Sequence, residues 1–405
     1  MTYKDTLNWM FSQLSMYQKE GKAAYKADLS NTIKFTKHLD FPEKNFKSVH
    51  IAGTNGKGSS SHMLASILQQ SGYNVGLYTS PHLKDFRERI KINGKEVDKR
   101  FVVDFISRNK AFFETNYLSF FEMTVGMAFE YFSKQKVDVA IIEVGLGGRL
   151  DSTNVITPEV SVITNIGLDH TQFLGETLEA IAFEKGGIIK PNIPVVIGET
   201  QKETTHVFTK LAEKNNSEIV FADQTISDIY KSDLKGSYQS KNIKTVIQTI
   251  KILKDKGYEI TDSHLVNGLL SVVRNTGLLG RWQVLNEKPK TVCDTGHNKE
   301  GLTYVMKQLQ TEVFETLHVV FGVVNDKDLS SIVHLLPKNA KYYFCKPNIS
   351  RGMDANILKN TFNGYGLKGN AYNSVNEAYN QAKKQSNSND FIFIGGSTFV
   401  VAEII

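Results

Sequence analysis

The sequence predicts an α/β protein with two domains, the first built on a mostly parallel sheet and the second a smaller Rossmann-like unit. Its 405 residues exceed the size at which one hydrophobic core usually stops growing, about 250 to 300 residues. With 40% hydrophobic and 22% charged residues, the chain can bury a core, which excludes a disordered or fibrous protein. Short runs rich in Val and Ile alternate with segments of helical period, as expected for parallel strands joined by helices.

The first domain is expected to contain five buried parallel strands, at Val49–Ala52, Val75–Tyr78, Val139–Val144, Val160–Thr164 and Val195–Ile197. The alternation starts afresh after Arg281, with strands at Thr291–Cys293, Leu317–Phe321, Tyr342–Phe344 and Phe391–Ile394, and helices near Leu302–Leu309 and Val375–Lys384. A hinge with two glycines, Thr276–Arg281, joins the two parts. We therefore expect a larger domain over residues 1–280 and a smaller one over residues 281–405.

Charge and cysteine content narrow the class of protein further. The net charge is 48 minus 42, or +6, and it is spread along the chain, so we expect no nucleic-acid partner. The mixed-charge stretch Asp85–Arg100 surrounds Asn93-Gly94 and is predicted to be a solvated type I′ hairpin. No apolar stretch resembles a signal peptide or a membrane span, and we expect a cytoplasmic protein with no membrane partner. Cys293 and Cys345 indicate neither a disulfide framework nor a thiolate metal site.

A glycine-rich loop follows the first predicted strand and precedes a helical pattern. Its residues are Gly53, Thr54, Asn55, Gly56, Lys57, Gly58 and Ser59. Glycines let backbone N–H groups surround phosphate oxygens, the helix N-terminus adds positive charge, and Lys57 can bridge the outer phosphates. The loop predicts a phosphate-loop domain that binds a nucleoside triphosphate. The spacing departs from the common phosphate-loop pattern, and a glycine turn that merely caps a helix is the alternative.

Polar side chains follow three further strands of the predicted sheet. Glu143 ends the strand at Val139–Val144, which is where phosphate-loop enzymes place a carboxylate near Mg²⁺. Ser80 follows the second strand and His170 lies shortly after the fourth. Ligands of α/β sheets collect at the carboxyl ends of strands, so these side chains are expected to converge. Residue chemistry does not choose between Lys185 and Lys190, which lie farther along the chain.

The order and spacing of five segments are specific: Gly53–Ser59, Thr79–His82, Glu143–Asp151, Gly167–His170 and Glu184-Lys185. Together they resemble the folylpolyglutamate synthase and dihydrofolate synthase family, a branch of the Mur ligase superfamily. The resemblance covers nearly the whole chain. It implies an ATP-binding larger domain, a smaller α/β domain and an active site in the cleft between them.

The resemblance also assigns roles to individual residues. It implies that Ser80 and Glu143 bind one Mg²⁺ that bridges the ATP phosphates, and that Glu143 and His170 hold a second metal. Lys185 matches the family lysine that is carbamylated and thereby becomes a carboxylate-like metal ligand. With Lys57, Lys185 and His170 are the expected catalytic residues.

Other segments are similar to the family's nucleotide motifs and imply binding roles for Asn242, Arg281, Asp294 and His297. One of these motifs departs from the family pattern. Where the family reads Asp-Gly-Ala-His-Asn-Pro, this chain has Asp294-Thr295-Gly296-His297-Asn298-Lys299. The order of the small residues is changed and the proline is replaced, so the course of this loop is open.

An acid and an amine need activation to form an amide in water, and this site offers activation by phosphate. We expect the carboxylate of dihydropteroate or a folate to attack the γ-phosphorus of ATP, giving an acyl phosphate that the amine of L-glutamate then attacks. Aromatic residues of Phe120–Phe129 have helical spacing and are predicted to be core; they and Asp151 are also candidates for a pterin site. We expect a monomer.

Two other classes of function remain open at this stage. A phosphate-loop binding module would share the loop, and another Mur-type ligase would share the chemistry but take a UDP-linked substrate. The sequence leaves open whether the chain makes dihydrofolate, extends folate polyglutamates, or does both.

Overall fold

A computed structural model of the chain describes residues 1–20, 28–325 and 328–405, with only the backbone described for residues 13–20. The chain divides into two compact units. Unit 1 comprises Met1–Asp233 and Ser240–Gly277, and unit 2 comprises Leu234–Gln239 and Leu278–Ile405. The segment Leu234–Gln239, which lies within the predicted first domain, therefore packs with unit 2. The domain limits of 1–280 and 281–405 stay a prediction.

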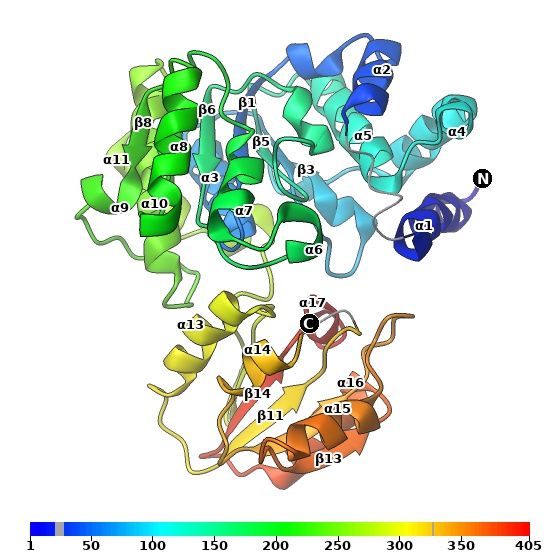
Figure 1. Cartoon of the computed structure of the whole chain (residues 1–405), viewed down its shortest axis with the longest axis vertical. Helices are drawn as coiled ribbons and strands as arrows, with labels where there is room; N and C mark the ends of the chain where they lie inside the picture. The colour runs from blue at the N-terminus through cyan, green and yellow to red at the C-terminus, as the bar shows by residue number, and fades with distance from the viewer. Residues whose placement is uncertain (21–27, 326–327) are drawn as a thin grey trace. The chain divides into compact units, whose positions relative to one another are not determined.

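Unit 1 is built on an eight-stranded sheet with the strand order β4-β3-β2-β5-β1-β6-β7-β8 (Figure 1). The strands are β1 (Lys47–Ala52), β2 (Val75–Tyr78), β3 (Ile90–Ile92), β4 (Lys95–Glu96), β5 (Val139–Glu143), β6 (Val160–Ile163), β7 (Val195–Ile197) and β8 (Ile219–Phe221). From β2 to β8 in this order all neighbours are parallel, whereas β3 pairs antiparallel with β2 and with β4. The five strands predicted for this part of the chain are confirmed.

The register of the central strands brings their carboxyl ends to one edge of the sheet. Ile51 of β1 pairs with Glu143 of β5, and Ala52 pairs with Ile163 of β6. The glycine loop after β1, the acid that ends β5 and the polar residues after β6 therefore leave the sheet at the same level. This is the edge at which α/β sheets bind ligands.

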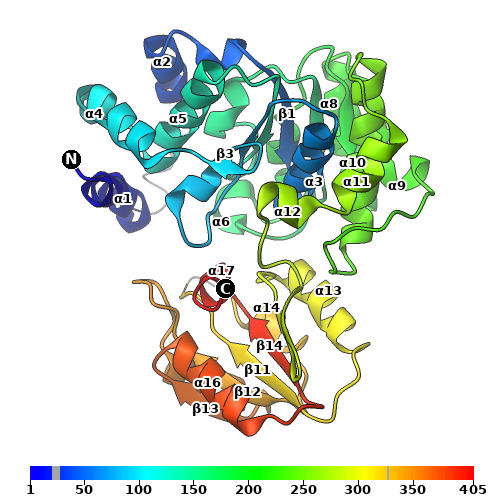
Figure 2. The same ribbon diagram turned by 180° about the vertical axis from the view of Figure 1, so that it is seen from behind.

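Helices cover both faces of this sheet. The helical segments of unit 1 are α1 (Tyr3–Glu20), α2 (Ser30–His38), η2 (Pro42–Lys44), α3 (Lys57–Gln70), η3 (Phe86–Arg89), α4 (Lys99–Asn116), α5 (Phe120–Lys134), η4 (Ser152–Val155), α6 (Thr171–Leu174), α7 (Leu178–Gly186), α8 (Lys202–Lys214), α9 (Ala222–Thr225), α10 (Gln239–Asp255), α11 (Asp262–Leu269) and α12 (Val272–Thr276). Figure 1 shows α7 and α8 in front of the sheet, and Figure 2 shows α3 and α11 on the opposite face. The apolar side chains of α7 and α8 form one core cluster with the last residues of β1, β6 and β7.

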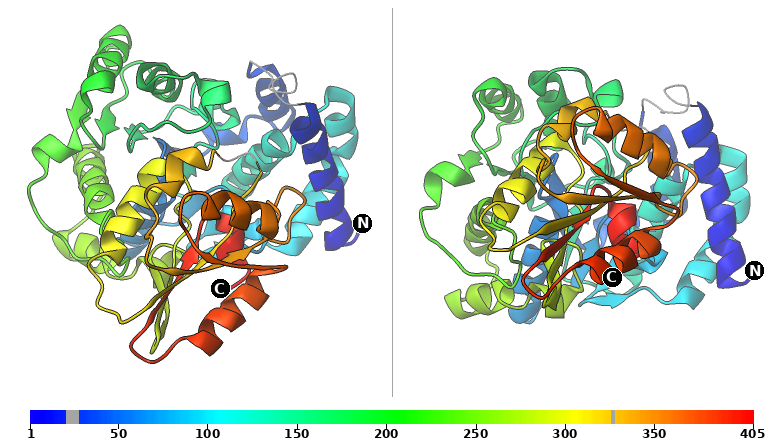
Figure 3. Two further views of the ribbon diagram at one scale, coloured as in Figure 1. Left: turned by 60° about the horizontal axis from the view of Figure 1, so that its bottom comes forward. Right: turned by 90° about the horizontal axis from the view of Figure 1, so that it is seen from below.

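Unit 2 contains a six-stranded sheet with the order β13-β12-β11-β14-β10-β9, in which only β9 is antiparallel to its neighbour. The strands are β9 (Gln283–Glu287), β10 (Lys290–Cys293), β11 (Leu317–Phe321), β12 (Lys341–Cys345), β13 (Gly369–Tyr372) and β14 (Phe391–Gly395). The helices are α13 (Lys299–Leu309), α14 (Ser330–Val333), α15 (Ala355–Asn363), α16 (Val375–Gln385) and α17 (Thr398–Ala402). Helices α13 to α15 pack on one face and α16 and α17 on the other, and Figure 3 shows α15 and α16 on opposite sides of the sheet.

Two local predictions can be compared with the structure. Asn93 and Gly94 both have positive φ, 47° and 76°, as a type I′ turn between β3 and β4 requires. The expectation that this stretch is solvated is wrong for Arg89 and Lys91, whose side chains are buried because they pack inside unit 1. The aromatic stripe lies in α5, where Phe129 and its apolar neighbours belong to the core, as predicted. Among the described residues, no helix is long and apolar enough to cross a membrane.

Candidate active site

The glycine loop joins the carboxyl end of β1 to the N-terminus of α3. Gly53 and Gly56 have positive φ, and a Cβ at Gly56 would overlap Oδ1 of Asn242. Thr164 Oγ1 donates to the carbonyl of Asn55 at 2.6 Å, which fixes the loop to the end of β6. Helix α3 begins at Lys57 with no acidic residue in its first turn and no side-chain cap, so its N-terminal N–H groups face the loop without a competing carboxylate.

Gly56→Ala is expected to fold and to lose at least about tenfold in ATP affinity, because the new methyl group must displace Asn242 and Ala disfavours this backbone conformation. Calorimetric titration with ATP measures the loss. Gly72→Ala is the matched control: Gly72 has nearly the same φ, 87° against 85°, but a Cβ there meets nothing within 4 Å. An unchanged affinity in Gly56→Ala would contradict a role of this loop in nucleotide binding.

Two lysine amines converge on the carbonyl of Gly53. Lys57 Nζ donates to Gly53 O at 3.0 Å and to Thr54 O at 3.3 Å, and Lys185 Nζ donates to the same Gly53 oxygen at 2.9 Å. Lys185 lies in the last turn of α7 and is 5% exposed. Burial, together with the nearby charge of Lys57, lowers the pKa of Lys185 to about 7.

The structure distinguishes Lys185 from Lys190 by their contacts, whereas residue chemistry left the choice between them open. Lys190 is partly buried and donates to the carbonyl of Asn154 at 2.8 Å, away from the glycine loop. Lys185 is the amine that reaches the loop. The metal-binding role that the family resemblance gives to Lys185 stays a prediction.

Glu143 and Ser80 are neighbours at the ends of β5 and β2. The Glu143 carboxylate is 4% exposed, and its Oε2 accepts a hydrogen bond from the backbone N–H of Ser80 at 3.3 Å. Among the described residues, no group of three or more His, Cys, Asp or Glu side chains is placed to hold a metal ion. A single carboxylate close to the backbone of a serine fits Mg²⁺, which commonly takes one or two carboxylates together with phosphate oxygens and water.

His170 has an exposed side chain at the N-terminus of α6. Its φ is 53°, and its backbone N–H donates to Oδ1 of Asp169 at 3.0 Å. The left-handed conformation turns the chain sharply between the end of β6 and α6. A metal-binding role for His170 together with Glu143 stays a prediction.

Asp151 organises the loop that follows Glu143. Its Oδ2 accepts from the backbone N–H groups of Gly145 and Leu146 at 3.0 and 2.9 Å, and its Oδ1 accepts from the N–H and hydroxyl of Thr153. Burial raises the pKa of Asp151, although these donors oppose the shift. The carboxylate therefore holds the loop in place from inside, and direct contact with a pterin stays a prediction.

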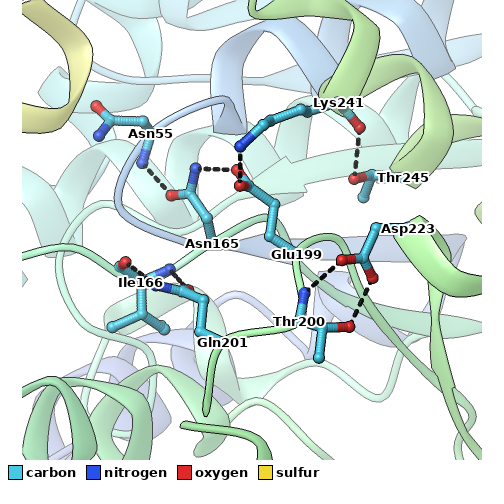
Figure 4. A network of polar contacts seen from close by, with 9 residues as sticks. All are labelled: Asn55, Asn165, Ile166, Glu199, Thr200, Gln201, Asp223, Lys241 and Thr245. Atoms are coloured by element: carbon cyan, nitrogen blue, oxygen red, sulfur yellow. Dashed lines mark hydrogen bonds and ion pairs between the residues drawn. The ribbon is translucent and has the colours of Figure 1, made fainter. Parts of the chain in front are cut away.

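A chain of polar contacts supports the glycine loop from the neighbouring strand ends (Figure 4). The backbone N–H of Asn55 donates to Asn165 Oδ1 at 2.9 Å, and Asn165 Nδ2 donates to Glu199 Oε1 at 2.9 Å. Lys241 Nζ closes the chain by an ion pair with Glu199 Oε2 at 2.5 Å. Because Lys241 precedes Asn242 in α10, this network ties β6, β7 and α10 to the loop. Sequence reasoning missed Glu199 and Lys241, although Glu199 shows the signal of a polar residue just after a strand.

In unit 2, the buried carboxylate of Asp294, directly after β10, accepts several hydrogen bonds. Its Oδ2 accepts from Tyr238 Oη at 2.6 Å and from the N–H of Trp282 at 2.7 Å, and its Oδ1 accepts from the N–H of Gly296. Burial raises the pKa of Asp294. Arg281 donates to the hydroxyl of Thr295, so three segments of the chain meet here: the one with Tyr238, the one with Arg281 and Trp282, and the loop after β10.

The altered loop after Asp294 keeps an ordered course. His297 Nδ1 donates to the carbonyl of Thr295 at 2.9 Å, and Asn298 caps α13 by accepting from the N–H of Gly301 at 2.8 Å. Lys299 is the first residue of α13, a position at which a proline would also be tolerated. Nucleotide contacts of Arg281, Asp294 and His297 stay predictions.

Comparison with known proteins identifies the family. The Mur ligase middle domain matches residues 51–287, and the Mur ligase glutamate ligase domain matches residues 280–398. A dihydrofolate synthase/folylpolyglutamate synthase of Bacillus subtilis is 30% identical over an alignment 435 residues long. The alignment covers 99% of this chain and 98% of that protein. The chain belongs to the folylpolyglutamate synthase/dihydrofolate synthase family. The resemblance to this branch of the Mur ligase superfamily is thereby confirmed.

Two further members of the family bear on the length and fold of the chain. A probable bifunctional folylpolyglutamate synthase/dihydropteroate synthase of Haloferax volcanii is 31% identical over all of this chain, but the chain spans only 50% of that protein. A bifunctional folylpolyglutamate synthase/dihydrofolate synthase of Yersinia pestis, solved with AMPPNP and Mn ion, superposes with a TM-score of 0.83. It is 26% identical, and the match covers 98% of this chain and 97% of that one. The predicted α/β fold class is confirmed.

Proposed function

We propose that this chain is an ATP-dependent ligase that adds L-glutamate to dihydropteroate, to reduced folates, or to both. The observation that carries the proposal is the convergence of Lys57 and Lys185 on the glycine loop, at the strand edge where Glu143 and Ser80 also meet. Such an edge has the cationic and carboxylate groups that γ-phosphoryl transfer requires. The names of the relatives and the nucleotide and metal in the solved family member support the same reaction.

The acid substrate attacks the γ-phosphorus of ATP through a carboxylate oxygen, and the bond from that phosphorus to the bridging oxygen breaks to release ADP. The N–H groups of the glycine loop and the Lys57 ammonium offset the charge that develops on the phosphate oxygens. The acyl phosphate then reacts with the amine of L-glutamate, which loses a proton, and the tetrahedral adduct expels phosphate. No protein nucleophile is needed, so the side chains act by positioning and by electrostatics.

Glu143 and Ser80 are the residues that would hold Mg²⁺, which supplies charge neutralisation at the phosphates. Lys185, as a carbamate, would add a negatively charged ligand beside Glu143 and His170 for a second ion. Asn242 packs on Gly56 of the loop and is placed to contact the nucleotide. From unit 2 we assign Arg281, Asp294 and His297 to the nucleotide, with Asp294 acting through the backbone that it orders.

Glutamate-dependent ADP release with alternative acceptors tests this function. We expect release with dihydropteroate, with tetrahydrofolate, or with both, and no release when glutamate is omitted. The preference between the two acceptors distinguishes dihydrofolate synthesis from chain extension. Release with a UDP-linked peptide acceptor instead would indicate another Mur-type ligase. ATP binding without any glutamate-dependent release would indicate a binding module.

A further inference from the structure

Arg89 is a buried cation just before β3, with strands β2 and β5 between β3 and the strand β1 that leads into the glycine loop. Arg89 ends η3, and its carbonyl accepts from the backbone N–H of Thr79 at 3.1 Å. This bond places its backbone beside the residue that precedes Ser80. The side chain is 8% exposed.

The neighbours of the Arg89 guanidinium carry no compensating charge in direct contact. Its Nε donates to His82 Nδ1 at 2.8 Å, and the guanidinium lies over the ring of Phe120, 5.2 Å from the centroid. Among the side chains that the structure describes, no carboxylate forms an ion pair with Arg89. Because His82 Nδ1 accepts the hydrogen bond from Arg89, it carries no proton, and the ring adds no positive charge beside Arg89.

The nearby acidic groups have other partners. The Glu88 carboxylate accepts from the backbone N–H groups of Leu83, Lys84 and Asp85. The Tyr78 phenol also lies against Arg89, and it is neutral because burial raises its pKa. Glu143 attracts Arg89 without forming an ion pair with it, and its Oε2 accepts from the N–H of Ser80. Arg87, two residues away, shows the contrast, because it forms ion pairs with Asp85 at 3.0 Å and Glu96 at 3.1 Å.

A buried guanidinium without an ion pair is costly, because buried charges are normally paired. An anionic ligand would supply the missing partner. A guanidinium binds a carboxylate through two parallel N–H···O bonds. The surroundings also suit an aromatic acid, because Phe120 stacks on Phe11 with centroids 5.2 Å apart and meets Phe86 edge-on at 5.9 Å.

We propose that Arg89 binds the carboxylate of the acid substrate and holds it for attack on ATP. The inference rests on the proposed function and adds the group that recognises the acid. Without a cation, the negative charge of Glu143 would repel a second carboxylate at this strand edge. Arg89 offsets that repulsion and orients one carboxylate oxygen, while Phe11, the exposed ring of the three, contacts the benzoate ring of dihydropteroate.

The test compares dihydropteroate with the same compound lacking its carboxyl group, using the full chain without ATP. Wild type is expected to bind dihydropteroate at least about tenfold more tightly than the decarboxylated compound. Arg89→Met should lose this preference, because only the binding of dihydropteroate becomes weaker. Arg89→Lys should retain part of the preference, because lysine keeps the charge but lacks the two parallel N–H donors of a guanidinium. Arg87→Met is the matched control and should keep the preference of wild type.

The outcomes separate the two proposals. If Arg89→Met and Arg89→Lys weaken both compounds equally, Arg89 only supports the fold and the assignment is overturned. If both variants keep the full preference, it is also overturned. A wild type that binds neither compound overturns the proposed function, and this assignment falls with it. Thermal unfolding of each variant reports whether it is folded, and Arg89→Lys provides the comparison if Arg89→Met does not fold.

Discussion

Lys57→Ala is expected to fold and to lose nearly all glutamate-dependent ADP release. Lys57 is the cation of the glycine loop, and its ammonium lies 3.0 Å from the carbonyl of Gly53, within the turn that would surround the phosphates. Removing one preorganised donor at a developing anion costs about 2 to 4 kcal/mol, which corresponds to a loss of roughly 30-fold to 10³-fold in turnover. Steady-state ADP release at saturating ATP, glutamate and acceptor measures the loss.

Lys190→Ala is the matched control for this change. Lys190 is also partly buried and also donates to a backbone carbonyl, that of Asn154, but it does not contact the loop. We expect its turnover to stay within about threefold of wild type, as is usual for a residue outside the reacting groups. A folded Lys57→Ala protein with near-normal turnover would show that the loop does not stabilise phosphoryl transfer.

The strands predicted from sequence are those buried on both faces. Val75–Tyr78 and Val195–Ile197 are continuous apolar runs, and the structure has β2 and β7 at these bounds. The missed strands lie at sheet edges, where one face meets solvent and the apolar run is lost. Gly369–Tyr372, the edge strand β13, has no fully buried side chain and no apolar run to identify it.

Some residues of the candidate site were likewise predictable from the sequence, and others only from the structure. Glu143, Ser80 and the glycine loop were predictable because parallel strands end at one edge, so residues far apart in sequence meet there. Arg89 was not predictable as a site residue, because a mixed-charge stretch beside a turn is typical of a solvated hairpin. Only the tertiary structure shows that α5 covers this arginine, with the Phe120 ring below its guanidinium. Glu199 was missed for a similar reason, since its partner Lys241 is 42 positions away in sequence.

Lys185→Ala is expected to lose most activity, with a magnitude similar to that of Lys57→Ala, if the lysine carries a carbamate that binds metal. The neutral amine is the form that reacts with CO₂, giving a carbamate and releasing one proton. Since burial lowers its pKa to about 7, about half of the Lys185 amine is neutral at pH 7. An ordinary lysine has fewer than about one neutral amine in a thousand at this pH. Acetate, which fits the space left by the side chain and supplies a carboxylate, should restore part of the activity of Lys185→Ala.

The sign of the pH dependence follows from the same lowered pKa. Above about pH 7 the folded state leaves Lys185 neutral, whereas the unfolded state keeps the proton up to about pH 10.5. Across this window the unfolded state binds more protons, so stability rises with pH, and the full penalty of the buried charge acts below about pH 7. Lys185→Met removes that penalty and should therefore gain more in free energy of unfolding at pH 6 than at pH 9.

Loss of activity in a variant that is more stable can only come from the chemistry of the site. Wild type kept in CO₂-free buffer at pH 8 should accordingly lose activity and recover it on addition of bicarbonate. Lys57 provides the contrast, because no step of its proposed role consumes CO₂, and the residual activity of Lys57→Ala should not be rescued by acetate. Full activity of the wild type without CO₂, together with an active Lys185→Ala protein, would leave Lys185 as a buried lysine that only fixes the carbonyl of Gly53.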